Sequence, residues 1–281
     1  MSSAIKTILA LSLALVLSFT LVGCGGELPQ EEIDRIVTNV TTAEFDTVKL
    51  DMDMSMTVRV EGGDEPGEVT MVGDGTGVMD MANREMQMRM NMTVDRPELG
   101  KQEMATEVYL VGEWMYTGVD IPEIGKQWVK MEFSEEIWQQ QSQVEQQIEL
   151  LKTAVEIKSL PDETVNGTDC YVFQVVPSME ALGELLSQQA LGMEGMDFGQ
   201  FNLADLFKEM SIKEWIAKDS YWVMKTEVDM VMEMRPADVG ATEADFEKMT
   251  MDINIVERLY DYNQPVSITL PPEALNAPEM P

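Results

Sequence analysis

The sequence predicts an α+β protein built on one antiparallel sheet of about ten strands, with helices covering one face. Three observations support this fold class. Alternating apolar and polar residues recur in segments of strand length, and turn-like connections between them are short, which makes neighbouring strands antiparallel. A helical period appears only near the start and in the middle of the chain. No linker is long or biased enough to separate two domains.

Residues 1–23 are expected to form a cleaved export signal, followed by a single domain at 24–281. Lys6 gives a positive start, residues 8–22 are mostly apolar, and a small Gly23 precedes Cys24. The apolar run is too short to span a bilayer comfortably. The ending at residues 21–24 resembles the lipobox of prokaryotic lipoproteins, which implies that the Cys24 sulfur receives a diacylglycerol and that the chain is cut just before it. The alternative is an ordinary secretory signal with an incidental cysteine.

The first element of the mature chain is expected to be a short amphipathic helix at residues 29–42. Ile33, Ile36, Val37 and Val40 have helical spacing there. The period then changes to two at residues 50–61, where apolar residues alternate with Asp, Ser, Thr, Arg and Glu. This pattern is typical of a half-buried strand with one polar face.

The same alternation predicts the other strands, and Asn166-Gly167 marks a tight hairpin turn between two of them. The further strands are expected at residues 68–81, 85–95, 103–111, 114–118, 127–131, 155–164, 169–176, 212–217, 221–234 and 246–260. Helices are expected at residues 134–152, 178–190 and 203–210. Residues 271–281, rich in proline, are expected to form a loose C-terminal tail.

Composition excludes several functions. The formal net charge is −32, from 51 acidic and 19 basic residues, so the surface repels nucleic acid. The chain has no histidine, which removes Ser-His-Asp and Cys-His catalysis and the usual imidazole metal sites. We therefore expect a non-enzyme without a cofactor. If Cys24 is lipidated, Cys170 has no partner in the chain and is expected to be a small buried hydrophobe.

Several short segments resemble the LolA/LppX-like lipoproteins: residues 109–116, 128–131, 165–171 and 262–266, together with the lipobox, the early helix and the meander of long strands. The resemblance covers nearly all of the mature chain. It implies an unclosed β half-barrel whose concave apolar face is capped by helices and holds lipid or acyl chains, and it carries no catalytic residues. One departure is that the soluble carrier branch has no anchor, whereas this chain is expected to have one.

The 25 methionines gather at alternate positions of the predicted strands. Three interpretations are open: packed core, since methionine fills irregular gaps; a cavity whose flexible lining suits apolar tails; and Cu(I) binding by Met-X-Met thioethers. The candidates for a cavity lining are Met52, Met54, Met56, Met86, Met88, Met90, Met92, Met230, Met232 and Met234.

The leading hypothesis is a lipoprotein anchored through its N-terminal lipid on the extracytoplasmic face of a membrane, where it binds a lipid or another apolar ligand in a methionine-rich concavity. The first alternative is a structural or interaction lipoprotein without a ligand. Soft-metal binding by the Met-X-Met strands is a weaker alternative, because sheet amphipathicity alone explains the alternation.

Overall fold

The computed structural model describes residues 28–62, 67–97, 100–122, 124–134, 138, 148, 150–180, 182, 206–236 and 246–280. Its elements are α2 (Gln30–Thr42), β1 (Thr47–Glu61), β2 (Gly67–Asp80), β3 (Glu85–Arg96), β4 (Gly100–Val111), β5 (Trp114–Ile121), β6 (Gly125–Glu132), β7 (Glu156–Val165), β8 (Thr168–Val176), β9 (Phe207–Ala217), β10 (Val223–Met234), β11 (Lys248–Tyr260) and the short helix η4 (Pro272–Asn276).

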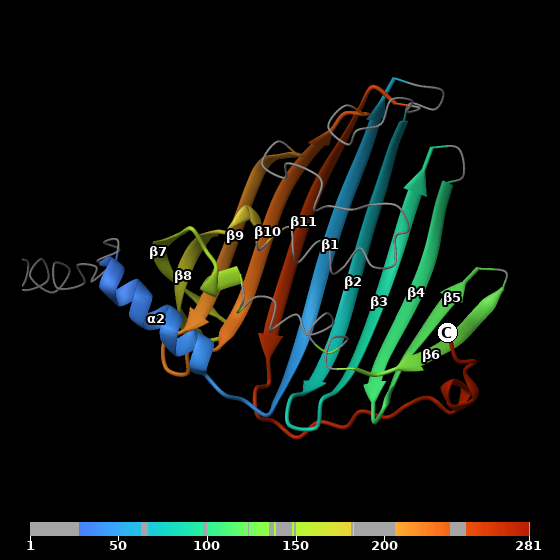
Figure 1. Ribbon diagram of the computed structural model, residues 1–281, viewed down its shortest axis with the longest axis horizontal. Helices are drawn as coiled ribbons and strands as arrows, with labels where there is room; N and C mark the ends of the chain where they lie inside the picture. Colours follow the sequence, from blue (N-terminus) through green and yellow to red (C-terminus); the bar gives the residue numbers. More distant parts are fainter. Residues whose placement is uncertain are drawn as a thin grey trace, which may run out of the picture.

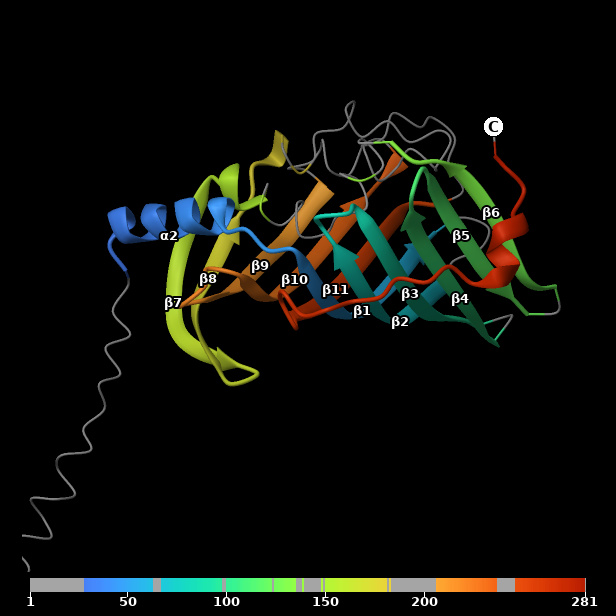
Figure 2. The same ribbon diagram turned by 90° about the horizontal axis from the view of Figure 1, so that it is seen from below.

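The strands form one 11-stranded sheet in the order β6-β5-β4-β3-β2-β1-β11-β10-β9-β8-β7 (Figure 1). Each neighbouring pair is antiparallel. The strands β6 and β7 stand at the two ends of this order, so the sheet is not closed. Figure 2 shows that the sheet bends, with α2 on the inner side of the bend. The predicted fold class, an unclosed antiparallel half-barrel, is confirmed.

Register assigns each strand residue to one of two faces. We call the face that carries Met54 the inner face and the face that carries Asp53 the outer face. On β1, buried Val48 and Leu50 precede Met52 and Met54 on the inner face, while Asp53 and its alternate neighbours point outward. The helix α2 lies against the inner face near β7, where the Leu28 amide donates a hydrogen bond of 2.7 Å to Ser159 Oγ. Its apolar stripe of Ile33, Ile36 and Val40 is buried in the main core.

The predicted helix at residues 203–210 is wrong for its last four residues, whereas Leu206 is helical. Residues 207–210 belong to β9, where Phe207 pairs with Met232 and Met210 pairs with Met230. Pairing with β10, which continues across a register shift between Val231 and Met232, outweighs the local helical spacing of these residues. In the other two predicted internal helices, the described residues 138, 148, 150–152, 179–180 and 182 are helical, and residues 134 and 178 precede them without helical structure. The remaining residues of these two predictions lie outside the described residues.

The expected loose tail is also wrong for residues 271–280. Ala274 is fully buried, and Ala277 is nearly so, in a second cluster with Tyr109, Tyr116 and Trp128 on the outer face of β4–β6. The segment then runs beside β6: the Lys130 amide donates to Pro278 O at 2.9 Å, and the Met280 amide donates to Lys130 O at 2.8 Å. The prolines of this segment led to the prediction of a loose tail, because proline interrupts helices and strands. A segment without regular structure can nevertheless pack against the domain.

These contacts also protect the sheet edges. An exposed edge strand presents unpaired backbone groups to other chains. The C-terminal segment covers part of β6 through the Lys130–Glu279 bridge. The other edge, β7, has a register shift between Leu160 and Glu163 that leaves Pro161 outside the ladder. A bulge with proline is a common way to make an edge unsuitable for pairing.

Cys170 is buried and free, as expected. It lies on β8 opposite Ala217 of β9, and its Sγ donates to Thr168 O at 3.4 Å. Burial raises the pKa of this thiol, so little thiolate is present near neutral pH.

We predict that a chain beginning at residue 25 reacts slowly with a thiol reagent while folded, because Cys170 is then its sole sulfhydryl and is shielded. Labelling should be at least about tenfold faster in guanidinium, where the thiol is exposed. Stopped-flow absorbance measures both rates, and Cys170→Ala gives the background. Equal rates in the two conditions would contradict the buried position.

Candidate functional site

All the candidate methionines lie on the inner face. Met54 pairs with Gly73 on β2, which in turn pairs with Met92 on β3. On the other side, Met56 pairs with Ile253 of β11, which pairs with Met230 of β10. Because directly paired residues in antiparallel strands share a face, these rows place the candidates on one continuous surface.

Their burial divides them into two groups. Met52, Met86 and Met88 are buried in the main core, and Met232 and Met234 are buried in a smaller cluster with Leu206. The remaining candidates are partly exposed: Met54, Met56, Met90, Met92 and Met230. The core interpretation therefore holds for the first group. The partly exposed methionines, which lie between the two buried clusters, are the part of this surface that an apolar ligand can contact.

A glycine stripe on β2 shapes this surface. Gly73, Gly75 and Gly77 occupy the inner face between the methionines of β1 and β3. A Cβ added at Gly75 would lie 3.4 Å from Met90 Cγ and 3.5 Å from Met52 Cε. A Cβ at Gly77 would lie only 2.8 Å from Leu50 Cγ. Side chains from both neighbouring strands thus lean over β2 and take the space that its own side chains leave empty. The alternating glycines of residues 73–77 were visible in the sequence, but their role depends on the register.

A row of polar side chains is buried within the same inner face. Glu257 of β11 pairs with Thr226 of β10, and Thr226 pairs with Glu214 of β9. Glu214 is fully buried, Thr226 is 5% exposed and Glu257 is 6% exposed. We call these three residues the acidic row. Sequence reasoning missed it, although Glu214 occupies an apolar position of its strand, between Ile212 and Ile216.

Two members of the acidic row lack the hydrogen bonds that buried polar groups normally form. Both carboxylate oxygens of Glu214 and the Thr226 Oγ1 are buried and form no hydrogen bond in the described part of the chain. Burial, assisted by the nearby Glu257 carboxylate, raises the pKa of Glu214 to about 8. Burial and then Glu257 also raise the pKa of Tyr262 well above its usual value. A charged carboxylate at Glu214 is thus strongly disfavoured.

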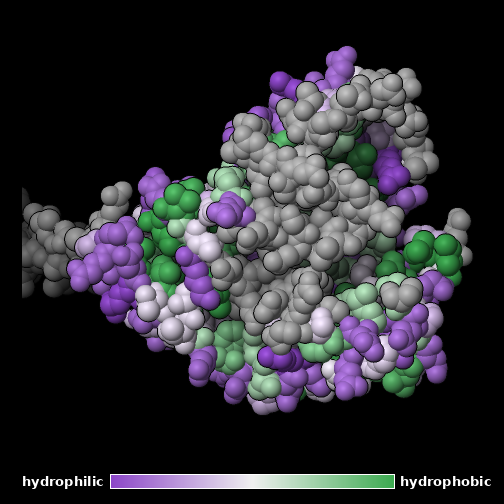
Figure 3. Space-filling model, viewed as in Figure 1, coloured by the Kyte–Doolittle hydropathy of each residue, from purple (hydrophilic) through white to green (hydrophobic). Residues whose placement is uncertain are grey.

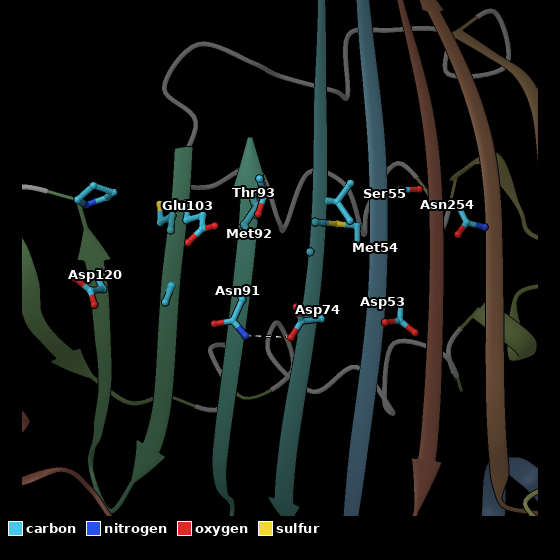
Figure 4. A pocket seen from close by; sticks show the side chains of 15 residues that line it. Asp53, Met54, Ser55, Asp74, Asn91, Met92, Thr93, Glu103, Asp120 and Asn254 are labelled. Carbon is cyan, nitrogen blue, oxygen red and sulfur yellow. Dashed lines mark hydrogen bonds between the residues drawn. The ribbon is translucent and has the colours of Figure 1, made fainter. Parts of the chain in front are cut away.

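A separate groove of about 910 Å³ opens on the outer face. Figure 4 shows Asp53, Asp74, Asn91 and Asp120 across neighbouring strands of this groove. Of the candidate methionines, Met54 and Met92 border it. Since the Met54 and Met92 side chains belong to the inner face, the groove does not coincide with the predicted cavity.

Four polar side chains of this groove have partners from neighbouring strands. Asn91 Nδ2 donates to Asp74 Oδ2 at 3.0 Å, Asn254 Nδ2 donates to Asp229 Oδ1 at 2.7 Å, and Arg258 forms an ion pair of 2.7 Å with Asp53. No group of three or more His, Cys, Asp or Glu residues suited to a metal ion occurs among the described residues. The groove is therefore best explained as the hydrated polar face of the sheet.

Figure 3 shows hydrophilic and hydrophobic residues interspersed at the α2 end and along the lower edge of the view. Within the described residues, no helix has the length and apolar character needed to cross a bilayer.

We predict that Glu214→Gln changes how stability depends on pH. The unfolded pKa is near 4.5 and the folded pKa is about 8, so the folded state alone holds this proton between those pH values. The free energy of unfolding of the wild type should consequently fall as pH rises through this window. Glutamine resembles the protonated acid and does not titrate, so the variant should gain at least about 1 kcal/mol over the wild type between pH 5 and pH 8.

Urea unfolding at several pH values tests this expectation. Glu227→Gln is the matched control, because Glu227 lies on the outer face of β10 and pairs with Lys225. The free energy of unfolding of this control should change with pH in the same way as that of the wild type across the same range. Parallel curves for Glu214→Gln as well would contradict the buried, protonated state of this residue.

Comparisons with known proteins give one family and several similar structures. LprF from Mycobacterium bovis aligns with a TM-score of 0.42 at 13% identity, covering 86% of this chain and 98% of that one. Lipoprotein LppX from Mycobacterium tuberculosis aligns with a TM-score of 0.38 at 13% identity, covering 84% and 99%. No curated protein matches the chain. A family model matches residues 32–279, and the chain therefore belongs to the family of unknown function DUF6612.

Proposed function

We propose that this protein is a lipoprotein held on the extracytoplasmic face of a membrane, and that its methionine-rich inner face binds a lipid or another apolar ligand. The observation that carries the proposal is the register, which collects the candidate methionines on one face and leaves Met54, Met56, Met90, Met92 and Met230 partly exposed. Unbranched, polarisable methionine side chains adapt to apolar partners of different shape.

The contrast between the two faces supports an apolar ligand on the inner one. Acidic and amide side chains on the outer face are hydrogen bonded or ion paired and face water. The inner face presents thioethers, which cover the buried backbone of Gly73 and Gly75. A lipid tail on this surface would remove apolar area from water without desolvating charged groups.

The N-terminal arrangement supports anchoring at the α2 end. Cys24 lies outside the described residues, and the first described residue, Leu28, is already hydrogen bonded to Ser159 of β7. Few residues separate a lipid on Cys24 from the folded domain, so the anchor would keep the α2 end close to the membrane surface. Two acyl chains provide stable attachment.

A structural or interaction lipoprotein without a ligand is the second candidate. The observation that favours it is the full burial of Met86 and the near-complete burial of Met52, Met88, Met232 and Met234. Those residues stabilise the fold whether or not a ligand exists, so the two candidates differ only in what the partly exposed methionines do.

We predict that Cys24→Ser prevents lipidation and processing. In a bacterial host that modifies lipoproteins, the variant should accumulate at precursor size or be released, whereas the wild type should be membrane-bound at its mature size. Fractionation followed by immunoblotting measures both properties, and labelling with a palmitate analogue reports the lipid directly. Membrane attachment of Cys24→Ser at mature size would rule out this anchor.

We predict that Met54→Glu weakens binding of an apolar probe far more than Met54→Leu. Leucine keeps the site apolar at nearly the same volume and should cost less than about 1.5 kcal/mol in stability. Glutamate would have to be desolvated against the ligand, so the probe affinity should fall by at least about tenfold. Fluorescence titration of the signal-free domain measures the affinity.

Ser55→Glu is the matched control for this pair. Ser55 is the next residue on β1 and lies exposed on the outer face, so the same new charge should leave probe binding unchanged. Failure of the correctly folded wild-type domain to bind any probe would remove the ligand-binding proposal and favour the structural lipoprotein.

A further inference from the structure

We propose that the acidic row is the polar subsite of the inner face, and that it selects an amphiphile whose head group carries an ammonium. This inference rests on the proposed function, because it assigns a head-group site to the surface that binds the apolar tail. Its central residues are Glu214 and Thr226, which come from neighbouring strands and are buried side by side.

The first argument is the unused hydrogen-bonding capacity of the row. Natural proteins satisfy nearly all buried polar groups, and an exception in a folded protein needs an explanation. Here both oxygens of the fully buried Glu214 and the Thr226 hydroxyl have no hydrogen-bond partner among the described residues. A ligand that donates several hydrogen bonds would supply what the fold does not.

The second argument is the position of neighbouring basic residues. Lys213 and Lys225 are each one residue from a member of the row, so the period of two directs them to the outer face. Lys225 forms an ion pair of 2.5 Å with Glu227 and lies 4.2 Å from the Trp215 ring centroid. Lys225 therefore compensates an outer-face carboxylate, Lys213 lies on the face opposite the row, and an external cation remains the simplest partner for Glu214.

The third argument is continuity with the methionine surface. Glu257 pairs directly with Met52 of β1, and Met52 pairs with Gly75, which pairs with Met90. A single cross-strand row thus leads from the buried acids to the thioether side chains that cover Gly75. An amphiphile along this row would place its head at Glu214 and Thr226 and its tail toward Met52 and Met90.

The chemistry of the row favours an ammonium over other heads. A carboxylate or phosphate would be repelled by the charge of Glu257 and has no proton to donate to the oxygens of Glu214. A hydroxyl donates one hydrogen bond, whereas a primary ammonium donates three and brings the counter-charge that a buried carboxylate lacks. The raised pKa of Glu214 in the ligand-free protein agrees with the absence of that counter-charge. With two carboxylates in the row, and no metal-suited group among the described residues, a metal cation is a poorer match.

The test compares ligands that differ only in the head group. Decylamine, decanol and decanoate are each titrated against phenylnaphthylamine, a neutral apolar probe, bound to the delipidated signal-free domain. The loss of probe fluorescence gives the affinity of each competitor. We expect decylamine to bind at least about tenfold more tightly than decanol, and decanoate to bind most weakly. The preference should persist in high salt, because buried charges are screened much less than exposed ones.

Variants then locate the preference. Glu214→Gln should reduce the advantage of decylamine over decanol by at least about tenfold. Thr226→Val, which removes the hydroxyl at similar volume, should reduce it by a smaller factor. Glu227→Gln removes the same charge from the outer face of β10 and should leave the preference unchanged, which controls for the overall acidity of the protein.

The outcomes separate this inference from the function on which it rests. Probe binding together with equal affinity for the three heads, or an amine preference that survives Glu214→Gln, would overturn the subsite and leave the apolar surface standing. The same loss of preference in Glu227→Gln would assign it to general acidity and also overturn the subsite. Absence of probe binding by the folded wild type would overturn both.

Discussion

The period of two along a single long sheet is the constraint on which the rest of this structure depends. Each strand has one apolar and one polar side, and a shift by an odd number of residues would turn the apolar side of a strand away from the others. A slip of β1 by one residue against β2 and β11 would exchange Met54 for Asp53 on the inner face. That slip is strongly opposed because it would remove Val48 and Leu50 from the main core, where both are fully buried. The same register therefore produces the core, the methionine surface and the hydrated outer face.

Alternation also made much of the fold predictable. The strands and the first helix were recognisable because their periods of two and 3.6 persist over many residues. The turn at Asn166-Gly167 was recognisable because this pair of residues tolerates the positive φ angles that a tight hairpin requires, and the structure gives them φ values of 50° and 86°. Residues 207–210 were misassigned because a short apolar segment fits either period, and its pairing with β10 decides the outcome. The packing of residues 271–280 was missed because it depends on Tyr109 and Trp128, which are distant in the sequence.

The candidate site was predictable only to the level of a face. The sequence indicated which methionines share a side of the sheet, but not which of them are covered, since Met86 and Met92 occupy equivalent positions of one strand and differ in exposure. Burial depends on what lies above the sheet. The glycine stripe and the acidic row were missed for a related reason: Gly75 matters because Met52 and Met90 lean over it, and Glu214 matters because Thr226 and Glu257 stand beside it.

The acidic row places carboxyl groups in a face of the sheet that is otherwise apolar. With 51 acidic residues, this protein could satisfy its need for solubility entirely on the outer face, where carboxylates are hydrated. A glutamate inside an apolar layer contributes nothing to solubility and opposes folding whenever it is ionised. Glutamine or leucine at position 214 would avoid that penalty without disturbing the register. Local departures from folding logic of this kind concentrate at functional sites. The acidic row is therefore the part of the inner face that packing explains least, and the methionines around it are the part that packing explains best.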